Sequence, residues 1–309
     1  MCTCVIRVLA IAWLLSACAG VPVVPSGREA VVLGDDHVER TQLHWIPMVD
    51  GDGTKHLLRA RVCYPDGPGP FRVVAIAHGS PPDPADRPGM KLGSCTGEVA
   101  RWFVAHGFIV VFALRRGYGA TGGAWAEGFG KCPDKVDFVK AGLETARDDD
   151  AIIAYATALP RARPDGAVVV GQSAGGWGTL AYNSIAHARV VALVNMAGGR
   201  GGHDGGVRNH NCRPDLLAAA AKSFGATATT PMLWIYTQND SFFAPAIAEQ
   251  LHDMFIAAGA RAELHILDAF GGDGHLLFNS PGGSQVWGPL VEAYLATQLS
   301  GASGAASSK

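Results

Sequence analysis

The chain has 309 residues, of which 48% are hydrophobic and 17% are charged, and its formal net charge is −2. This composition excludes an intrinsically disordered protein, and the lack of a positive net charge excludes a general attraction to nucleic acid or to anionic membranes. Glycine is frequent, with 40 residues, but it follows no Gly-X-Y period, which excludes collagen. We therefore expect a globular protein with many tight turns, whose partners are small molecules or proteins.

The first residues are typical of an export signal. Arg7 precedes an apolar run over residues 8–15, which is too short to span a bilayer as a helix and is followed by small residues. Residues 15–18, Leu-Ser-Ala-Cys, resemble the lipobox of bacterial lipoproteins. The resemblance implies cleavage of a signal peptide over residues 1–17 and a lipid on Cys18, which would anchor an exported protein in the bacterial cell envelope.

Composition divides the rest of the chain into a tether, one domain and a tail. Pro22 and Pro25 lie in a stretch that is typical of a tether, and this disfavours the alternative of a buried N-terminal helix or strand. We place the tether at residues 18–36 and a single folded domain at residues 37–299. The small residues 300–309 have no means of burying surface, and we expect a disordered tail there.

Short apolar, β-branched runs alternate with helical stretches through the domain, a pattern typical of a mostly parallel sheet with helices on both faces. The predicted strands lie at residues 73–77, 108–113, 167–170, 190–194, 232–236 and 263–267, after an antiparallel hairpin within 41–65. The predicted helices lie at residues 97–106, 149–159, 174–187, 214–224, 245–258 and 285–299. Asp148 or Asp149 is expected to cap the second helix, and Pro160 to end it.

Four of the seven cysteines lie after Cys18, namely Cys63, Cys95, Cys132 and Cys212. An even number of cysteines in an oxidising compartment predicts two disulfides, and the spacing lacks the paired C-x-x-C of a zinc site. Four cysteines allow three connectivities. We favour Cys63 with Cys95 and Cys132 with Cys212.

The pentapeptide Gly171-Gln-Ser-Ala-Gly175 lies directly between a predicted strand and a predicted helix. In a glycine-rich chain the pentapeptide alone is weak evidence, but a chance match would seldom fall at such a junction. A strand-to-helix turn this tight forces the central serine into a strained backbone region and exposes its hydroxyl. We therefore expect Ser173 to be a nucleophile on an elbow, rather than part of a structural turn.

A serine nucleophile needs a base and a carboxylate that orients the base. Asp240 lies just past the end of a predicted strand, where open α/β sheets bind ligands, and His275 follows the next predicted strand. Asp268 and Asp273 are the alternatives to Asp240, but only Asp240 directly follows a strand between nucleophile and base. We assign His275 as the base and Asp240 as its partner, and we expect Asp273 to support the loop.

A tetrahedral intermediate also needs two N–H donors. Ala174, directly after the nucleophile, supplies one, and the loop after the strand at 73–77 should supply the other. Pro81 in that loop has no N–H, so the donor is Ser80 or Gly79, and we choose Ser80. We expect His78 to shape this loop by hydrogen bonding rather than to act as the base.

These motifs together resemble the α/β-hydrolase superfamily, and specifically its dienelactone hydrolase-like and prolyl oligopeptidase-like branch. The resemblance rests on His78-Gly79, Arg115-Arg-Gly-Tyr-Gly119, Gly171-Gln-Ser-Ala-Gly-Gly176, Asn239-Asp240 and Asp273-Gly-His275. It implies an α/β-hydrolase fold with an eight-stranded, mostly parallel sheet, and a serine hydrolase activity that requires no cofactor. Dienelactone hydrolases proper use a cysteine nucleophile where this chain has Ser173.

Residues near the expected site are candidates for the substrate pocket. We assign Arg116, Tyr118, Trp125 and Trp177 to it, with core packing as the alternative for the tryptophans and surface solvation for the arginine. The glycine-rich segment 198–212 is expected to form a short lid. The alternative for that segment, a metal site built from His203, Asp204 and His210, is not favoured, and we assign no metal.

The sequence thus predicts an exported, lipid-anchored serine hydrolase that acts on small-molecule carboxylic esters. Ser173 attacks the carbonyl, His275 transfers the proton and Asp240 orients the imidazole. One alternative is a peptidase of the prolyl oligopeptidase type. The other is a non-catalytic lipoprotein that binds a ligand on a hydrolase scaffold, which gives no reason for a complete triad.

Overall fold

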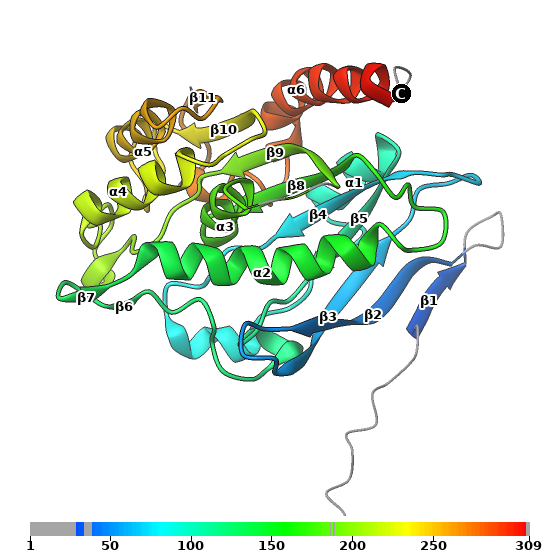
Figure 1. Ribbon diagram of the computed structural model, residues 1–309, viewed down its shortest axis with the longest axis horizontal. Helices are drawn as coiled ribbons and strands as arrows, with labels where there is room; N and C mark the ends of the chain where they lie inside the picture. The colour runs from blue at the N-terminus through cyan, green and yellow to red at the C-terminus, as the bar shows by residue number, and fades with distance from the viewer. Residues whose placement is uncertain (1–28, 34–38, 186, 188, 307–309) are drawn as a thin grey trace, which may run out of the picture.

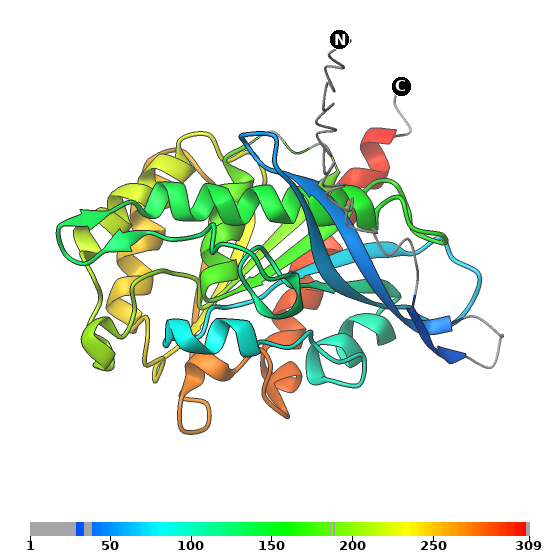
Figure 2. The same cartoon turned by 90° about the horizontal axis from the view of Figure 1, so that it is seen from below.

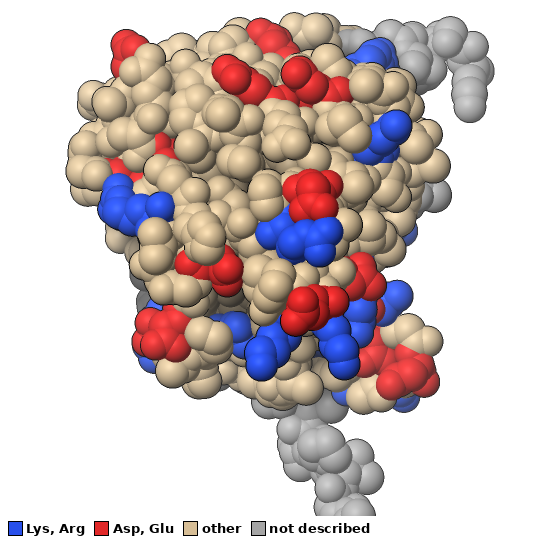
Figure 3. Space-filling view, turned by 90° about the vertical axis from the view of Figure 1, so that its left-hand side faces the viewer, with Lys and Arg blue, Asp and Glu red and all other residues tan. Residues whose placement is uncertain are grey.

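The computed structural model describes residues 29–33, 39–185, 187 and 189–306. The predicted signal peptide and the predicted lipidation of Cys18 lie outside these residues and stay predictions. In the described part of the chain, no helix is long and apolar enough to cross a membrane. On the face shown in Figure 3, acidic and basic side chains are interspersed and are separated by broad uncharged areas.

A nine-stranded sheet lies at the centre of the molecule (Figure 1). Its strands are β1 (Glu29–Leu33), β2 (Glu39–Val49), β3 (Lys55–Cys63), β4 (Arg72–Ala77), β5 (Phe108–Ala113), β8 (Ala167–Gln172), β9 (Val190–Met196), β10 (Met232–Thr237) and β11 (Ala262–Leu267). The spatial order is β1-β2-β3-β5-β4-β8-β9-β10-β11, antiparallel from β1 to β5 and parallel from β5 to β11. The predicted eight-stranded, mostly parallel sheet is confirmed, and β1 adds a strand at one edge.

Strand β1 corrects the predicted tether. Residues 29–33 pair antiparallel with β2, and Glu29 lies opposite Leu43. The run Ala-Val-Val-Leu at residues 30–33 has the apolar, β-branched character that favours a strand, and it follows the prolines that pointed to a tether. The sheet therefore begins before the predicted start of the domain at residue 37.

Six α-helices in the described residues cover the two faces of the sheet. They are α1 (Glu98–Ala105), α2 (Phe138–Ala156), α3 (Ala174–Asn183), α4 (Pro214–Gly225), α5 (Pro245–Ala257) and α6 (Gly283–Ala306). Residues of α1 and α6 share one buried cluster with Val74 and Ile76 of β4, whereas residues of α2 to α5 share the cluster on the opposite face with Val73 and Ala75. Figure 2 shows α2 above the sheet and α1 below it. Because alternate side chains are buried on opposite faces, the central strands are apolar throughout.

Helix α2 begins earlier than predicted. Its N-terminus is capped by Asp137, not by Asp148 or Asp149. The Asp137 side chain accepts a hydrogen bond from the Lys140 amide at 2.8 Å. Asp148 and Asp149 lie inside the helix and are buried. The Asp148 carboxylate accepts a hydrogen bond from Arg116, which lies in the loop after β5. Local sequence signals do not reveal this contact.

Helix α6 continues to Ala306, past the predicted end of the domain at residue 299. Alanine is the strongest helix former and recurs in this segment, so the helix extends without a large apolar residue. This corrects the predicted tail for residues 300–306, and residues 307–309 lie outside the described part. The remaining predicted strands and helices are all present, with small shifts at their ends.

Two disulfides are present among the described residues, with the connectivity favoured from the sequence. Cys63 at the end of β3 bonds Cys95 before α1, and Cys132 bonds Cys212. The second bridge joins the loop of a small ribbon, β6 (Gly130–Lys131) and β7 (Lys135–Val136), to the glycine-rich loop after β9. Both predicted pairings are confirmed.

Short elements follow the carboxyl ends of the parallel strands. They are the 3-10 turns η1 (Pro84–Gly89), η2 (Gly119–Thr121), η3 (Asp204–Gly206) and η4 (Gly274–Leu276), together with the β6–β7 ribbon. Ligands of open α/β sheets bind outside this edge. These loops therefore surround the place where the predicted functional residues meet.

Candidate active site

Ser173 lies at the turn between β8 and α3, in a backbone conformation that L-residues rarely adopt, with φ 54° and ψ −118°. The two glycines of the pentapeptide make this turn possible. A Cβ atom on Gly171 would collide with the Gly175 carbonyl, and one on Gly175 would collide with the Ala77 carbonyl of the neighbouring strand. The turn is therefore a strained elbow held by tight backbone packing, and Ser173 is at its apex.

The side chains of His275 and Asp240 form a buried pair. The His275 Nδ1 atom lies 3.0 Å from both carboxylate oxygens of Asp240. Asp240 Oδ1 also accepts the amides of Phe242 at 2.8 Å and Phe243 at 2.9 Å, which fixes the carboxylate. With Nδ1–H directed at a carboxylate, Nε2 carries the free lone pair, as a base requires.

The two alternative carboxylates lie elsewhere. Asp273 accepts the amides of Ser241 and His275, each at 3.1 Å, and so braces the turn η4. Burial acts to raise the pKa of Asp273, but hydrogen bonds from the Ser241 hydroxyl and from these two amides outweigh it and lower the pKa below its ordinary value. Asp268 accepts a hydrogen bond from Gln238 at the exposed edge. Among the three candidates, only Asp240 contacts the His275 ring.

Ser173 and His275 line one cavity, together with Ser80. Within the described residues no hydrogen bond joins Ser173 Oγ to His275 Nε2, and such bonds commonly tighten only when substrate binds. Ala174 and Ser80, the predicted oxyanion donors, also line a single cavity with Ser173. The fold thus brings together all five residues predicted for the triad and the oxyanion hole.

His78 supports the oxyanion loop through both ring nitrogens. Nδ1 donates to the Gly79 carbonyl at 2.6 Å, and Nε2 accepts the Arg115 amide at 3.2 Å. Burial, with help from the Arg115 charge, lowers the pKa of His78 to about 3. His78 is therefore neutral near pH 7, and its ring is fully occupied in shaping the loop.

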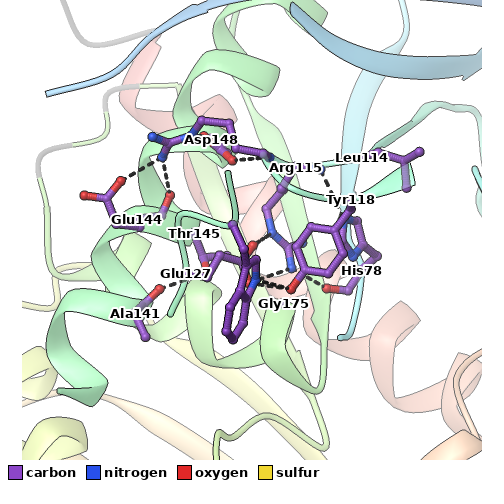
Figure 4. Close-up of polar contacts among 12 residues, drawn as sticks. His78, Leu114, Arg115, Tyr118, Glu127, Ala141, Glu144, Thr145, Asp148 and Gly175 are labelled. Atoms are coloured by element: carbon purple, nitrogen blue, oxygen red, sulfur yellow. Dashed lines mark hydrogen bonds and ion pairs between the residues drawn. The ribbon is translucent and has the colours of Figure 1, made fainter. Parts of the chain in front are cut away.

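A buried charge network lies beneath the site (Figure 4). Glu127 accepts hydrogen bonds from Arg115, from Arg200 and, at 3.0 Å, from the Tyr118 hydroxyl. Arg115 also donates to the His78 carbonyl at 2.8 Å. Burial acts to raise the pKa of Glu127, but the arginine charges outweigh it and hold the pKa below its ordinary value. The network joins three loops that surround Ser173.

Two clefts open beside Ser173. The arginine cleft has a volume of about 270 Å³, and its lining includes Arg87, Trp125, Phe129, Ala174 and Arg200. The apolar cleft has a volume of about 430 Å³, and its lining includes Ile76, Met90, Phe112, His275, Leu276 and Phe278, with Lys91 as a further cation. Ser80, Pro81, Pro82, Ser173 and Phe242 line both. The two clefts therefore meet at the nucleophile.

Three of the four predicted pocket residues are not in either cleft. Arg116 is buried against α2, where it pairs with Asp148 at 2.6 Å. Tyr118 is fully buried and bonded to Glu127, and Trp177 is fully buried in the core. Those predictions are wrong, because tertiary partners draw these side chains inward. Trp125 does line the arginine cleft, as predicted.

Several residues of the clefts were not predicted from the sequence. Phe242 stacks on the His275 ring, with centroids 4.2 Å apart, and so fixes the imidazole from one side. Arg87 and Arg200 line the arginine cleft. The sequence signal for Phe242 was an aromatic pair that begins two residues after Asp240, and the signal for Arg200 was a lone cation within a run of glycines. Arg87 had no such signal.

The glycine-rich loop does not gather its polar residues into one group. His203 Nε2 lies 2.9 Å from the Ser241 carbonyl, and the His203 ring stacks on Phe242. His210 Nδ1 lies 2.9 Å from the Asp204 carbonyl. The loop instead contributes Arg200 and its neighbouring glycines to the wall of the arginine cleft.

Comparison with known proteins gives structural but not sequence matches. No protein-family model matches the chain, and no curated protein does. Among solved structures, an esterase from Pyrococcus furiosus matches with a TM-score of 0.57 at 14% identity, over 88% of this chain and 98% of that one. An acetyl xylan esterase from a Paenibacillus species matches with a TM-score of 0.56 at 14% identity, over 86% of this chain and 88% of that one. The chain has the α/β-hydrolase fold.

An acylaminoacyl peptidase from Pyrococcus horikoshii shares the α/β-hydrolase fold, with a TM-score of 0.58 at 12% identity. The match covers 85% of this chain but 43% of the peptidase. At these identities the likeness establishes the fold alone. In an α/β-hydrolase fold, an elbow serine after a central strand and a histidine after the last strand stand at one edge of the sheet, as they do here.

Proposed function

We propose that the protein is a serine hydrolase that cleaves carboxylic esters through an acyl-enzyme intermediate. The observation that carries the proposal is the buried His275–Asp240 pair, whose ring lines the same cavity as the strained Ser173. A structural role gives no reason for a serine in a left-handed elbow to face a histidine held by a carboxylate.

In this mechanism Ser173 Oγ attacks the ester carbonyl carbon and passes its proton to His275 Nε2. The carbonyl oxygen becomes an oxyanion, which the amides of Ala174 and Ser80 stabilise. The bond from carbon to the alcohol oxygen then breaks, and His275 protonates the leaving alcohol. Water, deprotonated by His275, attacks the acyl-serine, and the carboxylic acid leaves with Ser173 restored. Asp240 holds the imidazole in the required tautomer and stabilises the imidazolium.

Turnover of 4-nitrophenyl butyrate tests the proposal. We expect Ser173→Ala to lower kcat by about 10⁴-fold or more, because the covalent step is lost. Ser223→Ala is the matched control, since this serine is exposed on α4, and it should behave as wild type. Wild-type protein without turnover, or turnover that survives Ser173→Ala, contradicts the proposal.

A peptidase of the same mechanism is the second candidate, because the chain shares its fold with an acylaminoacyl peptidase. An amide leaves less readily than an alcohol and needs protonation at nitrogen as the bond breaks. Matched 4-nitroanilide and 4-nitrophenyl ester substrates discriminate the two. We expect turnover of the ester only, and comparable kcat/KM values on the anilide would favour the peptidase.

We also propose that the protein is exported and lipid-anchored through Cys18. The two disulfides are compatible with an oxidising compartment, and the four remaining cysteines of the domain are all used in them. Membrane fractionation of cells that express Cys18→Ser tests the anchor. We expect the variant to move from the membrane to the soluble fraction, and an unchanged distribution contradicts the anchor.

A further inference from the structure

The two guanidinium groups of the arginine cleft have different partners. Arg200 pairs with Glu127 and donates to the Thr145 hydroxyl at 3.0 Å. The Arg87 side chain makes no hydrogen bond or ion pair with any described residue, and its Nε is buried without a partner. Glu127 and Asp83 attract Arg87 from a distance and Arg200 repels it, but Glu127 is already shared by two arginines. Among the described residues of the cleft, the Arg87 guanidinium therefore has no ion-pair partner of its own.

Arg87 is held in a fixed plane by Trp125. Its Cζ atom lies 3.3 Å from the centroid of the Trp125 ring, so the guanidinium stacks on the aromatic face. The indole is fixed in turn, because Trp125 Nε1 donates to the Tyr118 hydroxyl at 3.0 Å. Stacking occupies a face of the guanidinium and leaves its N–H edge available. That edge is a planar fork, which matches the two oxygens of a carboxylate.

The chemistry of the leaving group decides which part of an ester enters each cleft. The alcohol oxygen must lie within hydrogen-bond reach of His275 when it is protonated. His275 lines the apolar cleft and is not among the residues of the arginine cleft. The alcohol therefore leaves through the apolar cleft, beside Phe112 and Phe278, and the acyl chain extends from Ser173 into the arginine cleft.

We propose that Arg87 binds a free carboxylate at the far end of the acyl chain, so that the substrate is a hemiester of a dicarboxylic acid with an apolar alcohol. The proposal rests on the esterase function proposed above and names the substrate class of that same site. A small cleft of about 270 Å³ suits a short acyl chain rather than a lipid tail.

Two esters with one leaving group test the proposal. 4-Nitrophenyl hydrogen glutarate carries the terminal carboxylate, and its terminal primary amide is a neutral partner of nearly the same shape. Both release 4-nitrophenol, so the ratio of their kcat/KM values reports recognition of the charge. We expect wild-type protein to prefer the carboxylate by about tenfold or more, because a bidentate pair with arginine is lost in the amide.

Variants of Arg87 assign the preference to this side chain. We expect Arg87→Met to lower the ratio to near one, and Arg87→Lys to keep part of it, since lysine retains the charge but lacks the fork. Arg101→Met is the matched control, because Arg101 is exposed on α1, and its ratio should equal that of wild type. The ratio is taken within each variant, so a partial loss of folded protein cancels.

The outcomes separate this proposal from the esterase function. A wild-type ratio near one, with both esters hydrolysed, overturns the carboxylate subsite and leaves the esterase intact. A high ratio that Arg87→Met does not lower overturns the role of Arg87. Hydrolysis of neither ester contradicts the esterase function itself, and the subsite falls with it.

Discussion

At the scale of single residues, the candidate site depends on which carboxylate holds His275. Both carboxylate oxygens of Asp240 lie 3.0 Å from His275 Nδ1, and two backbone amides fix this carboxylate, whereas Asp273 binds the His275 amide and Ser241 but not the ring. A carboxylate that contacts the ring sets its tautomer, and one that braces the loop sets its position. The two roles predict different losses when each charge is removed.

Asp240→Asn should lower kcat for ester hydrolysis by about 10⁴-fold, because an amide donor opposite Nδ1 favours the wrong tautomer of His275. Asp273→Asn keeps an oxygen acceptor for the two amides and should cost far less. Steady-state kinetics of the two purified variants with one ester make the comparison. A larger loss of kcat for Asp273→Asn would contradict the assignment of Asp240.

Residue roles could be predicted where they depend on position along the chain. The elbow serine, the acid and the base follow particular strands, and the parallel sheet brings the ends of those strands together. The role of Arg116 could not be predicted, because its partners Glu144 and Asp148 lie in a helix that packs across the loop. Arg87 was missed for the same reason, since only the tertiary structure places it over Trp125.

At the scale of elements, the loops around Ser173 are held by charges in the interior. Glu127 joins the loop after β5 to the glycine-rich loop after β9, through Arg115 and Arg200. Arg115 continues the connection to the oxyanion loop at His78. Removing one member of a buried ionic cluster leaves the others without compensation.

Glu127→Gln should destabilise the protein by about 3 kcal/mol or more, since two buried arginines lose their counter-charge. Urea unfolding measures this loss, and ester turnover should fall with it as the oxyanion loop loosens. Asp165→Asn is the control, because its pair with Arg163 is exposed, and its cost should stay within about 1 kcal/mol. Equal stabilities of the two variants would show that Glu127 does not hold the network.

Asp149, which is buried in α2, makes the folding stability depend on pH. Burial raises the pKa of this carboxyl to about 7, although the charge of Arg115 opposes the rise. The folded protein therefore binds a proton that the unfolded chain releases near pH 4, and folding stability falls as the pH rises from about 4 to about 7. In urea unfolding, the free energy of unfolding of Asp149→Asn relative to wild type should rise as the pH increases across that window and stay constant above it. A difference that does not change with pH would contradict the raised pKa.

At the scale of the whole molecule, periodicity and turn residues were enough to predict a mostly parallel sheet with helices on both faces. The boundaries of strands and helices that were predicted wrongly lie where two local sequence signals compete. A short apolar run became β1 despite nearby prolines, and a helix with buried aspartates began at an earlier cap. The two clefts could not be predicted at all, because they are shaped by loops whose conformations depend on distant contacts and on two disulfides.

Removal of the two disulfides should cost different amounts. Cys132 and Cys212 are 80 residues apart and Cys63 and Cys95 are 32 apart, so the longer loop gains more entropy in the unfolded chain. Replacing both cysteines of a bridge by serine should lower the free energy of unfolding by about 4.5 kcal/mol for Cys132–Cys212 and by about 3.7 kcal/mol for Cys63–Cys95. Urea unfolding at equal pH measures both losses. The reverse order would indicate that chain entropy does not govern their contribution.

Mapping of the covalent adduct left by a fluorophosphonate probe shows which serine is the nucleophile, because the probe reacts with serines activated by a base. We expect one adduct per molecule, on the peptide that contains Ser173, with no adduct in Ser173→Ala and strongly slowed labelling in Asp240→Asn. An unlabelled wild-type protein, or an adduct that persists in Ser173→Ala, would contradict the claim that Ser173 is the nucleophile.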